Sequence, residues 1–207
     1  MPRIISLFLA TLLLLGCSES STSVKLLPLS ETAVILAFGD SLTQGVGVNT
    51  VEDSYPSILS KLVNRTVINA GIPGEISQHG LERLPKVLNE TNPNLVILCH
   101  GGNDLLRRLD KQQLKSNLEA MILTIKASGA QVVLVSVPEA SLMLRPPSLY
   151  QELADKHGLA IQAEIMSELQ GERELKSDQV HFNKQGYALL ADSLFSLLQS
   201  AQAIHFD

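Results

Sequence analysis

Five residues along this chain have side chains or backbone groups that acyl-transfer chemistry could use. They are, in chain order, Ser41, Gly74, Asn103, Asp178 and His181. A serine hydroxyl can act as a nucleophile when a histidine removes its proton, and a carboxylate can orient that histidine. The backbone N–H of a glycine can approach a ligand closely, and an asparagine side chain supplies an amide donor. This set of residue types indicates nucleophilic hydrolysis, provided that the fold brings the residues together.

Ser41 follows an apolar run at residues 33–37, which predicts a short, buried parallel strand. Gly39 and Gly45 allow a sharp turn into a following helix. A serine at such a turn projects at the carboxyl edge of the sheet, where open α/β sheets bind their ligands. The alternative is that Asp40 and Ser41 only cap the helix, because both residue types are favoured at that position.

The rest of the chain alternates apolar runs with helical patterns. Further strands are expected at residues 67–70, 94–99, 131–137 and 159–161. Helices are expected at about 52–63, 78–89, 111–127 and 149–156 and from 183 onwards, with Pro85 near a kink or irregular turn. This alternation predicts a single α/β domain with a doubly wound parallel sheet.

The polar residues follow these strands, so we expect them at one edge of the sheet. Asp178 and His181 are three residues apart in the loop before the last helix. An irregular turn of that length can aim the carboxylate at one imidazole nitrogen and leave the other free. Each residue alone has an ordinary structural explanation, but the combination on successive loops is much harder to explain in that way.

Four blocks of the sequence resemble, in order, those of the SGNH (GDSL) hydrolase superfamily, over a match from about residue 33 to the C-terminus. The blocks are Gly39–Leu42, Asn69–Gly74, Gly101–Asp104 and Asp178–His181. The run from Asn69 to Gln78 and on to Pro85 is most similar to the bacterial periplasmic acyl-thioesterase, lysophospholipase and arylesterase group. The resemblance implies a three-layer α/β/α, flavodoxin-like fold with a five-stranded parallel sheet.

The resemblance also implies a role for each residue of the predicted site. Ser41 would be the nucleophile, His181 the general base and acid, and Asp178 the group that orients His181. The Ser41 and Gly74 N–H groups and the Asn103 side chain would form the oxyanion hole. This chemistry requires no cofactor, and no group of residues has convincing metal-ligand spacing. The chain also lacks the G-x-S-x-G motif of α/β-hydrolases and the glycine patterns of nucleotide-binding loops.

Our first hypothesis is a serine esterase that hydrolyses acyl esters or thioesters, including lysophospholipids, through an acyl-enzyme. Apolar residues in the loops could line an acyl pocket. These are Leu105, Leu106, Leu142, Met143 and Leu144. The alternatives are a carbohydrate O-deacetylase and a non-catalytic envelope lipoprotein.

The N-terminus has the features of a secretory signal. Arg3 precedes an apolar run that ends in Leu14–Leu15–Gly16–Cys17, which resembles the lipobox of bacterial lipoproteins. We therefore expect a signal peptide at residues 1–16, a lipidated Cys17 with a flexible tether to residue 30, and a hydrolase domain at 31–207. Such a protein would be held at the periplasmic face of the cell envelope, and Ser18 favours the outer membrane. The alternative is an ordinary cleaved signal.

Composition limits the other classes of partner. The 207 residues have a formal net charge of −5 and no basic clusters large enough for nucleic acid. We expect a monomer that binds a small substrate. Cys99 is expected to be a core residue, and His79 and His157 are expected to face solvent. The cationic residues Arg107, Arg108 and Lys111 would lie on a solvated face or contact lipid head groups. For His100, a packing role and a secondary role in the site both stay open.

Overall fold

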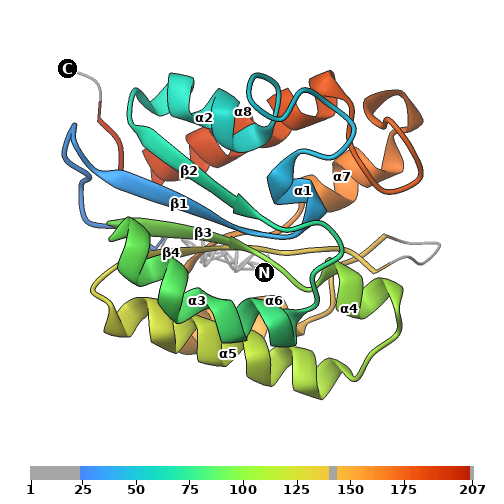
Figure 1. The fold of residues 1–207 in the computed structure, drawn as a ribbon, viewed down its shortest axis with the longest axis horizontal. Helices are drawn as coiled ribbons and strands as arrows, with labels where there is room; N and C mark the ends of the chain where they lie inside the picture. Colours follow the sequence, from blue (N-terminus) through green and yellow to red (C-terminus); the bar gives the residue numbers. More distant parts are fainter. Residues whose placement is uncertain (1–23, 140–143, 206–207) are drawn as a thin grey trace, which may run out of the picture.

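The computed structural model describes residues 24–139 and 144–205. A parallel sheet of five strands lies at its centre, in the spatial order β2–β1–β3–β4–β5. Figure 1 labels the first four of these strands. The strands are β1 (Val34–Gly39), β2 (Thr66–Gly71), β3 (Leu95–Cys99), β4 (Gln131–Val135) and β5 (Ala160–Gln162). This order is the flavodoxin-like arrangement, which places a ligand site where the direction of winding reverses, beside β1 and β3.

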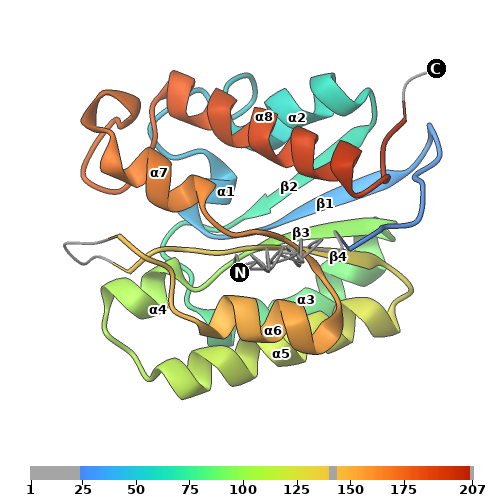
Figure 2. The same cartoon turned by 180° about the vertical axis from the view of Figure 1, so that it is seen from behind.

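Helices cover both faces of the sheet and complete the three layers. They are α1 (Ser41–Gln44), α2 (Tyr55–Val63), α3 (Ser77–Thr91), α4 (Gly102–Leu106), α5 (Lys111–Ala127), α6 (Leu149–His157), α7 (Ile165–Gly171) and α8 (Lys184–Ser200), with a 3₁₀ turn at Arg173–Leu175. Helices α1, α2, α7 and α8 lie on one face, and α3 to α6 lie on the other (Figures 1 and 2). The predicted fold class is therefore confirmed.

The central strands explain why their sequences are continuous apolar runs. Residues 35–38 of β1 and all of β3 are buried, because helices pack on both sides of the sheet. In the register, Gly39 is opposite Cys99, so β1 and β3 end at the same level. The loops that carry Ser41 and Asn103 therefore leave the sheet side by side.

Most predicted elements are present, with some differences at their ends. The helix predicted at 111–127 has those bounds in the structure. Helix α3 runs on to Thr91 with Pro85 inside it, and is longer than the predicted 78–89 segment. Helices α4 and α7 were not predicted, because five or seven residues are too few for a clear helical period.

Residues 24–30, which we expected to belong to a flexible tether, lie against the C-terminal segment. Leu26 N–H donates to the Ala201 carbonyl and Leu29 N–H to that of Ala203, both at 2.8 Å, and Leu29 is buried. The contacts of the folded domain thus begin before the predicted boundary at residue 31. The predicted signal peptide and Cys17 lie outside the described residues, among whose helices none is long and apolar enough to cross a membrane.

Candidate active site

The turn between β1 and α1 presents Ser41 at the carboxyl edge of the sheet. Asp40 is the N-cap of α1, and its Oδ1 accepts a hydrogen bond from Leu42 N–H at 3.1 Å. Ser41 is the first helical residue, and its Oγ lies 3.0 Å from His181 Nε2. The helix-capping interpretation therefore holds for Asp40, whereas the Ser41 hydroxyl faces a histidine that is 140 residues away in the chain.

The loop that carries His181 precedes α8 and is closed by a backbone hydrogen bond between its two ends. Ser177 N–H donates to the His181 carbonyl at 2.9 Å, and the Asn183 side chain caps α8. Inside this loop, Asp178 Oδ1 accepts hydrogen bonds from the backbone N–H groups of Val180 and His181, each at 2.8 Å. The other oxygen, Oδ2, lies 2.7 Å from His181 Nδ1. The structure thus brings Ser41, His181 and Asp178 together, as the sequence predicts.

The electrostatics of the loop define the state of the His181 ring. The hydrogen bond from the His181 N–H, with those from the ring and from Val180 N–H, lowers the pKa of Asp178 to about 2 despite some burial. An ionised carboxylate only accepts hydrogen bonds, so Nδ1 carries a proton toward Asp178. The other ring nitrogen, Nε2, faces Ser41 Oγ and is placed to take its proton.

Two more loops bring hydrogen-bond donors to Ser41. Gly74 follows β2 with φ +78°, a left-handed conformation that favours glycine. Its loop is held to β1 by a hydrogen bond from Ile72 N–H to the Gly39 carbonyl, at 3.1 Å. Arg107 Nη2 donates to the Gly74 carbonyl at 2.9 Å. Within the described residues the Gly74 N–H meets no acceptor, so it can serve a ligand.

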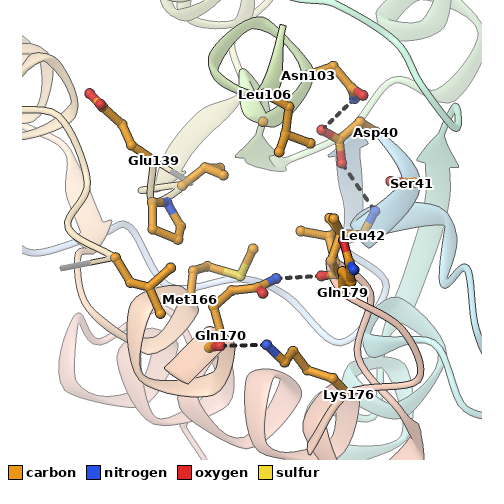
Figure 3. A pocket seen from close by; sticks show the side chains of 15 residues that line it. Asp40, Ser41, Leu42, Asn103, Leu106, Glu139, Met166, Gln170, Lys176 and Gln179 are labelled. Carbon is orange, nitrogen blue, oxygen red and sulfur yellow. Dashed lines mark hydrogen bonds between the residues drawn. The ribbon is translucent and has the colours of Figure 1, made fainter. Parts of the chain in front are cut away.

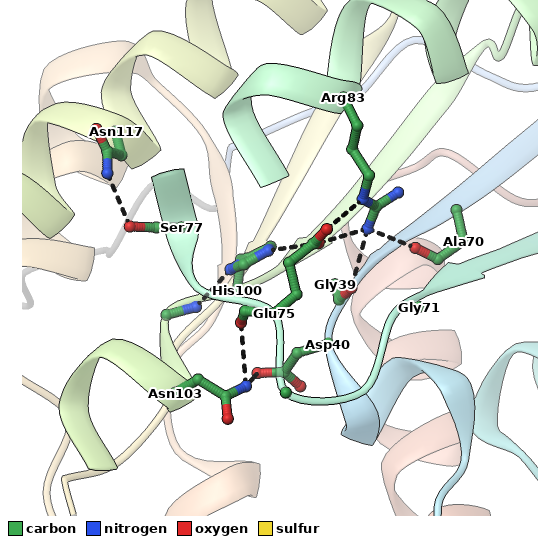
Figure 4. Close-up of polar contacts among 12 residues, drawn as sticks. Gly39, Asp40, Ala70, Gly71, Glu75, Ser77, Arg83, His100, Asn103 and Asn117 are labelled. Atoms are coloured by element: carbon green, nitrogen blue, oxygen red, sulfur yellow. Dashed lines mark hydrogen bonds and ion pairs between the residues drawn. The ribbon is translucent and has the colours of Figure 1, made fainter. Parts of the chain in front are cut away.

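Asn103 lies at the start of α4, and its amide nitrogen donates to two protein acceptors. Nδ2 is 3.2 Å from Asp40 Oδ2 and 3.0 Å from the Glu75 carbonyl oxygen (Figure 4). Burial raises the pKa of Asp40, although the nearby His100 and the Leu42 N–H oppose the shift. Both acceptors fix the direction of the Asn103 amide beside the Ser41 turn.

A cleft of about 360 Å³ opens beside Ser41 and Asn103 (Figure 3). Its apolar lining is Leu42, Leu106, Val137, Pro138, Leu144 and Met166. Polar groups contributed by Glu139, Gln170, Lys176 and Gln179 also border it. A mostly apolar cleft with a few polar groups suits a ligand that has one apolar arm.

The cleft only partly matches the predicted acyl pocket. Leu106 and Leu144 line it, as expected, but Leu105 is buried in the core instead. Leu142 and Met143 lie outside the described residues. Met166 was missed, because it belongs to a short helix whose place beside Ser41 depends on tertiary packing.

The remaining histidines and cationic residues differ in their surroundings. His157 is half-buried and lies 2.8 Å from Glu119, so its prediction as solvent-facing was wrong, whereas His79 is exposed. Arg107 is exposed but is bonded to the Gly74 loop, and Lys111 pairs with Glu139 at the cleft, so these two are more than a solvated face. His100 is completely buried and contacts Glu75.

Cys99 is a core residue, as predicted. It is buried at the end of β3, and burial raises the pKa of its thiol, which keeps it protonated. A second possible nucleophile is therefore inert. No group of three or more metal-ligating side chains occurs in the part of the chain that the structure describes.

Comparison with known proteins gives consistent results. The profile of the GDSL-like Lipase/Acylhydrolase family matches residues 37–189. An arylesterase of Vibrio mimicus is 40% identical over 108 residues, which are 50% of this chain and 54% of that protein, so the match spans about half the length of that relative. The Escherichia coli K12 protein called thioesterase 1/protease 1/lysophospholipase L1 is 30% identical over 173 residues, 80% of this chain and 83% of that protein.

The fold also matches solved structures. The crystal structure of the psychrotrophic esterase EstA from a Pseudoalteromonas species superimposes with a TM-score of 0.73. The match covers 81% of this chain and 97% of EstA, at 24% sequence identity. At that identity the likeness establishes the three-layer fold alone.

Proposed function

Because the chain belongs to the GDSL-like lipase/acylhydrolase family, we propose that it hydrolyses acyl esters or thioesters at the Ser41 hydroxyl. One observation carries the proposal. Ser41 Oγ, His181 Nε2 and Nδ1, and Asp178 Oδ2 form a continuous chain with separations of 3.0 and 2.7 Å at the mouth of an apolar cleft.

In the first half of the reaction, Ser41 Oγ bonds to the carbonyl carbon of the substrate while His181 Nε2 takes the hydroxyl proton. The tetrahedral intermediate then collapses. The bond to the alcohol or thiol breaks, and that leaving group takes the proton from Nε2. The products of this half are an acyl-Ser41 ester and the free alcohol or thiol.

In the second half, a water molecule replaces the leaving group. His181 Nε2 removes one proton from the water as its oxygen adds to the acyl carbon. Collapse breaks the bond to Ser41 Oγ, which regains a proton from Nε2, and the carboxylic acid is released. Asp178 stays ionised and stabilises the imidazolium in both halves.

The negative charge on the substrate oxygen needs donors on the side of the carbonyl opposite the histidine. The Ser41 and Gly74 N–H groups and the Asn103 amide are the proposed donors. Removing one such donor usually lowers the rate by about a hundredfold to a thousandfold. Asn103 Nδ2 donates to Asp40 and to the Glu75 carbonyl oxygen, so an oxyanion would share one of these hydrogens with a protein acceptor.

The cleft supports a medium or long acyl chain over an acetyl group. Leu106 and Leu144 are at least partly exposed in the cleft, where the methylenes of a longer acyl chain could lie against them. Each buried methylene contributes about 0.8 kcal/mol. A lysophospholipid combines one such chain with a polar head group, which could lie toward Lys176 or Glu139. We therefore propose lysophospholipids as one natural substrate class.

Hydrolysis of p-nitrophenyl esters from acetyl to palmitoyl tests the proposal, with Ser41→Ala as the inactive variant. Ser116→Ala, on the exposed face of α5, is the matched control that should keep full activity. Activity that depends on Ser41 and is highest with medium or long chains supports the proposal. Activity confined to acetyl esters would favour the carbohydrate deacetylase, and full activity in Ser41→Ala would refute the serine mechanism.

The predicted lipid anchor is a separate proposal that rests on the sequence around Cys17. Two or more acyl chains would hold the protein durably at a membrane, on the periplasmic side of the envelope. In a bacterial host, the wild-type protein should be labelled by radioactive palmitate and sediment with membranes. The Cys17→Ala variant should lose both properties, and unchanged sedimentation of that variant would refute the anchor.

A further inference from the structure

A second polar cluster lies behind the predicted oxyanion donors and is not used by the proposed mechanism. Its members are Glu75, Arg83 and His100 (Figure 4). Arg83 Nε and Nη2 each lie 2.7 Å from one oxygen of the Glu75 carboxylate. His100 Nε2 lies 3.1 Å from Glu75 Oε2. The Glu75 side chain is only 5% exposed and that of His100 is 0% exposed, so the cluster belongs to the interior.

The cluster contacts three of the four loops that carry the predicted site, namely those of Ser41, Gly74 and Asn103. Arg83 Nη2 donates to the carbonyl oxygens of Gly39 at 3.2 Å and Ala70 at 2.9 Å, at the ends of β1 and β2. Glu75 itself follows Gly74 in the chain. His100 lies on the loop of Asn103, and its Nδ1 accepts a hydrogen bond from Gly101 N–H at 3.0 Å.

The hydrogen bonds also fix the state of the His100 ring. Since Gly101 N–H donates to Nδ1, that nitrogen carries no proton, and the ring proton is on Nε2. Nε2–H therefore donates to the Glu75 carboxylate, and Tyr150 OH holds the His100 carbonyl at 2.9 Å. Burial opposes ionisation of Glu75, but the bonds from His100 and Arg83 outweigh it and lower the pKa of this carboxyl.

The backbone of Glu75 reaches Asn103 directly. Its carbonyl oxygen accepts from Asn103 Nδ2 at 3.0 Å. One residue thus holds the Asn103 amide through its carbonyl and the Asn103 loop through His100, while its N-terminal neighbour is Gly74. Any displacement of Glu75 would shift Gly74 and Asn103 relative to each other and to Ser41.

We propose that Glu75, Arg83 and His100 form a positioning network that keeps the Gly74 and Asn103 donors in place around the substrate oxygen at Ser41. This inference rests on the proposed function. Stability alone gives a poor reason for the cluster, because a buried ion pair can often be replaced by apolar residues without loss. Helix α3 also packs closely against this network at Gly80. A Cβ at that position would lie 2.4 Å from His100 Nε2, so only glycine leaves room for the His100 ring.

The test compares Glu75→Gln with Asn103→Ala, singly and together, in the full chain. In Glu75→Gln a carboxylate oxygen that accepts from Arg83 or His100 becomes an NH₂ group, so the loop must shift. We expect kcat on p-nitrophenyl butyrate to fall by roughly 10- to 100-fold, with KM changed by less than about threefold, because small misplacements of catalytic groups have effects of this size. Glu90→Gln, in an exposed pair with Lys86, is the matched control and should be unchanged.

The double variant separates positioning from a general loss of structure. If Glu75 acts through the Asn103 donor, Glu75→Gln should lower kcat much less in the Asn103→Ala background than in the wild type. Equal fold-losses in the two backgrounds would overturn the proposal. So would a Glu75→Gln variant with wild-type kcat, whatever its melting temperature.

A second pair of variants covers the case in which Glu75→Gln does not fold. The amide of His100→Gln can still reach Glu75 from the position of Nε2, whereas the shorter His100→Asn cannot. We expect His100→Gln to keep most of the wild-type kcat and His100→Asn to lose roughly tenfold. Equal kcat in the two would overturn the proposal. Full activity of Ser41→Ala would instead show that the proposed function itself has failed, independently of these comparisons.

Discussion

The Gly80→Ala substitution tests the packing of α3 against His100. We expect it to lower the free energy of unfolding, although replacing glycine by alanine inside a helix usually raises it. Gly80 lies inside α3, and replacing an interior helical glycine by alanine normally raises the free energy of unfolding by about 1 kcal/mol. Here the added Cβ would lie 2.4 Å from Nε2, 2.9 Å from Cδ2 and 3.2 Å from Cε1 of His100. Because His100 is completely buried, the ring has little room to move.

The magnitude follows from three contributions. Overpacking of a core costs about 1–3 kcal/mol, and displacing the ring from Glu75 breaks a hydrogen bond to a charged group, which contributes about 1.5–3 kcal/mol. The helical gain of about 1 kcal/mol offsets part of this. We therefore expect Gly80→Ala to lower the free energy of unfolding by roughly 1.5–5 kcal/mol and Tm by about 3–20 °C.

Urea denaturation of four proteins provides the measurement: the wild type, Gly80→Ala, His100→Ala and the double variant. Once the ring is absent, Gly80→Ala should stabilise the protein by about 1 kcal/mol, so the effect of the same substitution changes sign. Gly171→Ala, at the end of α7 with no atom closer than 4.0 Å to the new Cβ, is the control and should be neutral or stabilising. If Gly80→Ala stabilises the wild type as much as it stabilises His100→Ala, the described contact between α3 and His100 is wrong.

Three further predictions concern the site and its surroundings. The pKa of Asp178 is lowered from its ordinary value of 3.8 to about 2, so its ionised carboxylate stabilises the fold above pH 3.8 and this contribution is lost as the pH falls toward about 2. Between pH 5 and pH 2, Tm should therefore fall more steeply in the wild type than in Asp178→Asn. Parallel curves for the two proteins would contradict this. Met166→Ala should enlarge the cleft and raise the kcat/KM ratio of palmitoyl to butyryl esters by roughly tenfold, and an unchanged ratio would remove Met166 from the acyl site. In a Cys17→Ser protein, a thiol reagent such as DTNB should label Cys99 only after denaturation, and rapid labelling of the native protein would show that the end of β3 is accessible.

The sequence by itself determined the fold class, the main elements and the residues of the predicted site. The runs that became β1 and β3 are apolar because both faces of these strands are covered, and such burial is visible in the composition of a segment. Ser41, Gly74 and Asn103 follow β1, β2 and β3 respectively, so their place at one edge of the sheet follows from its parallel topology. Asp178 and His181 are only three residues apart, so their contact depends on the conformation of a single loop and could be predicted from the sequence.

Only the tertiary structure decided which side chains from different loops meet. The helical pattern of α3 gave no sign that Arg83 would bind Glu75, or that His100 would lie against Gly80. Likewise, Leu105 and Leu106 are neighbours of the same type, yet one is in the core and the other lines the cleft. The physical reason is that residue patterns report the backbone state and burial of their own segment. Partners across loops depend on how the strands and helices pack, and a pattern within one segment does not contain that information.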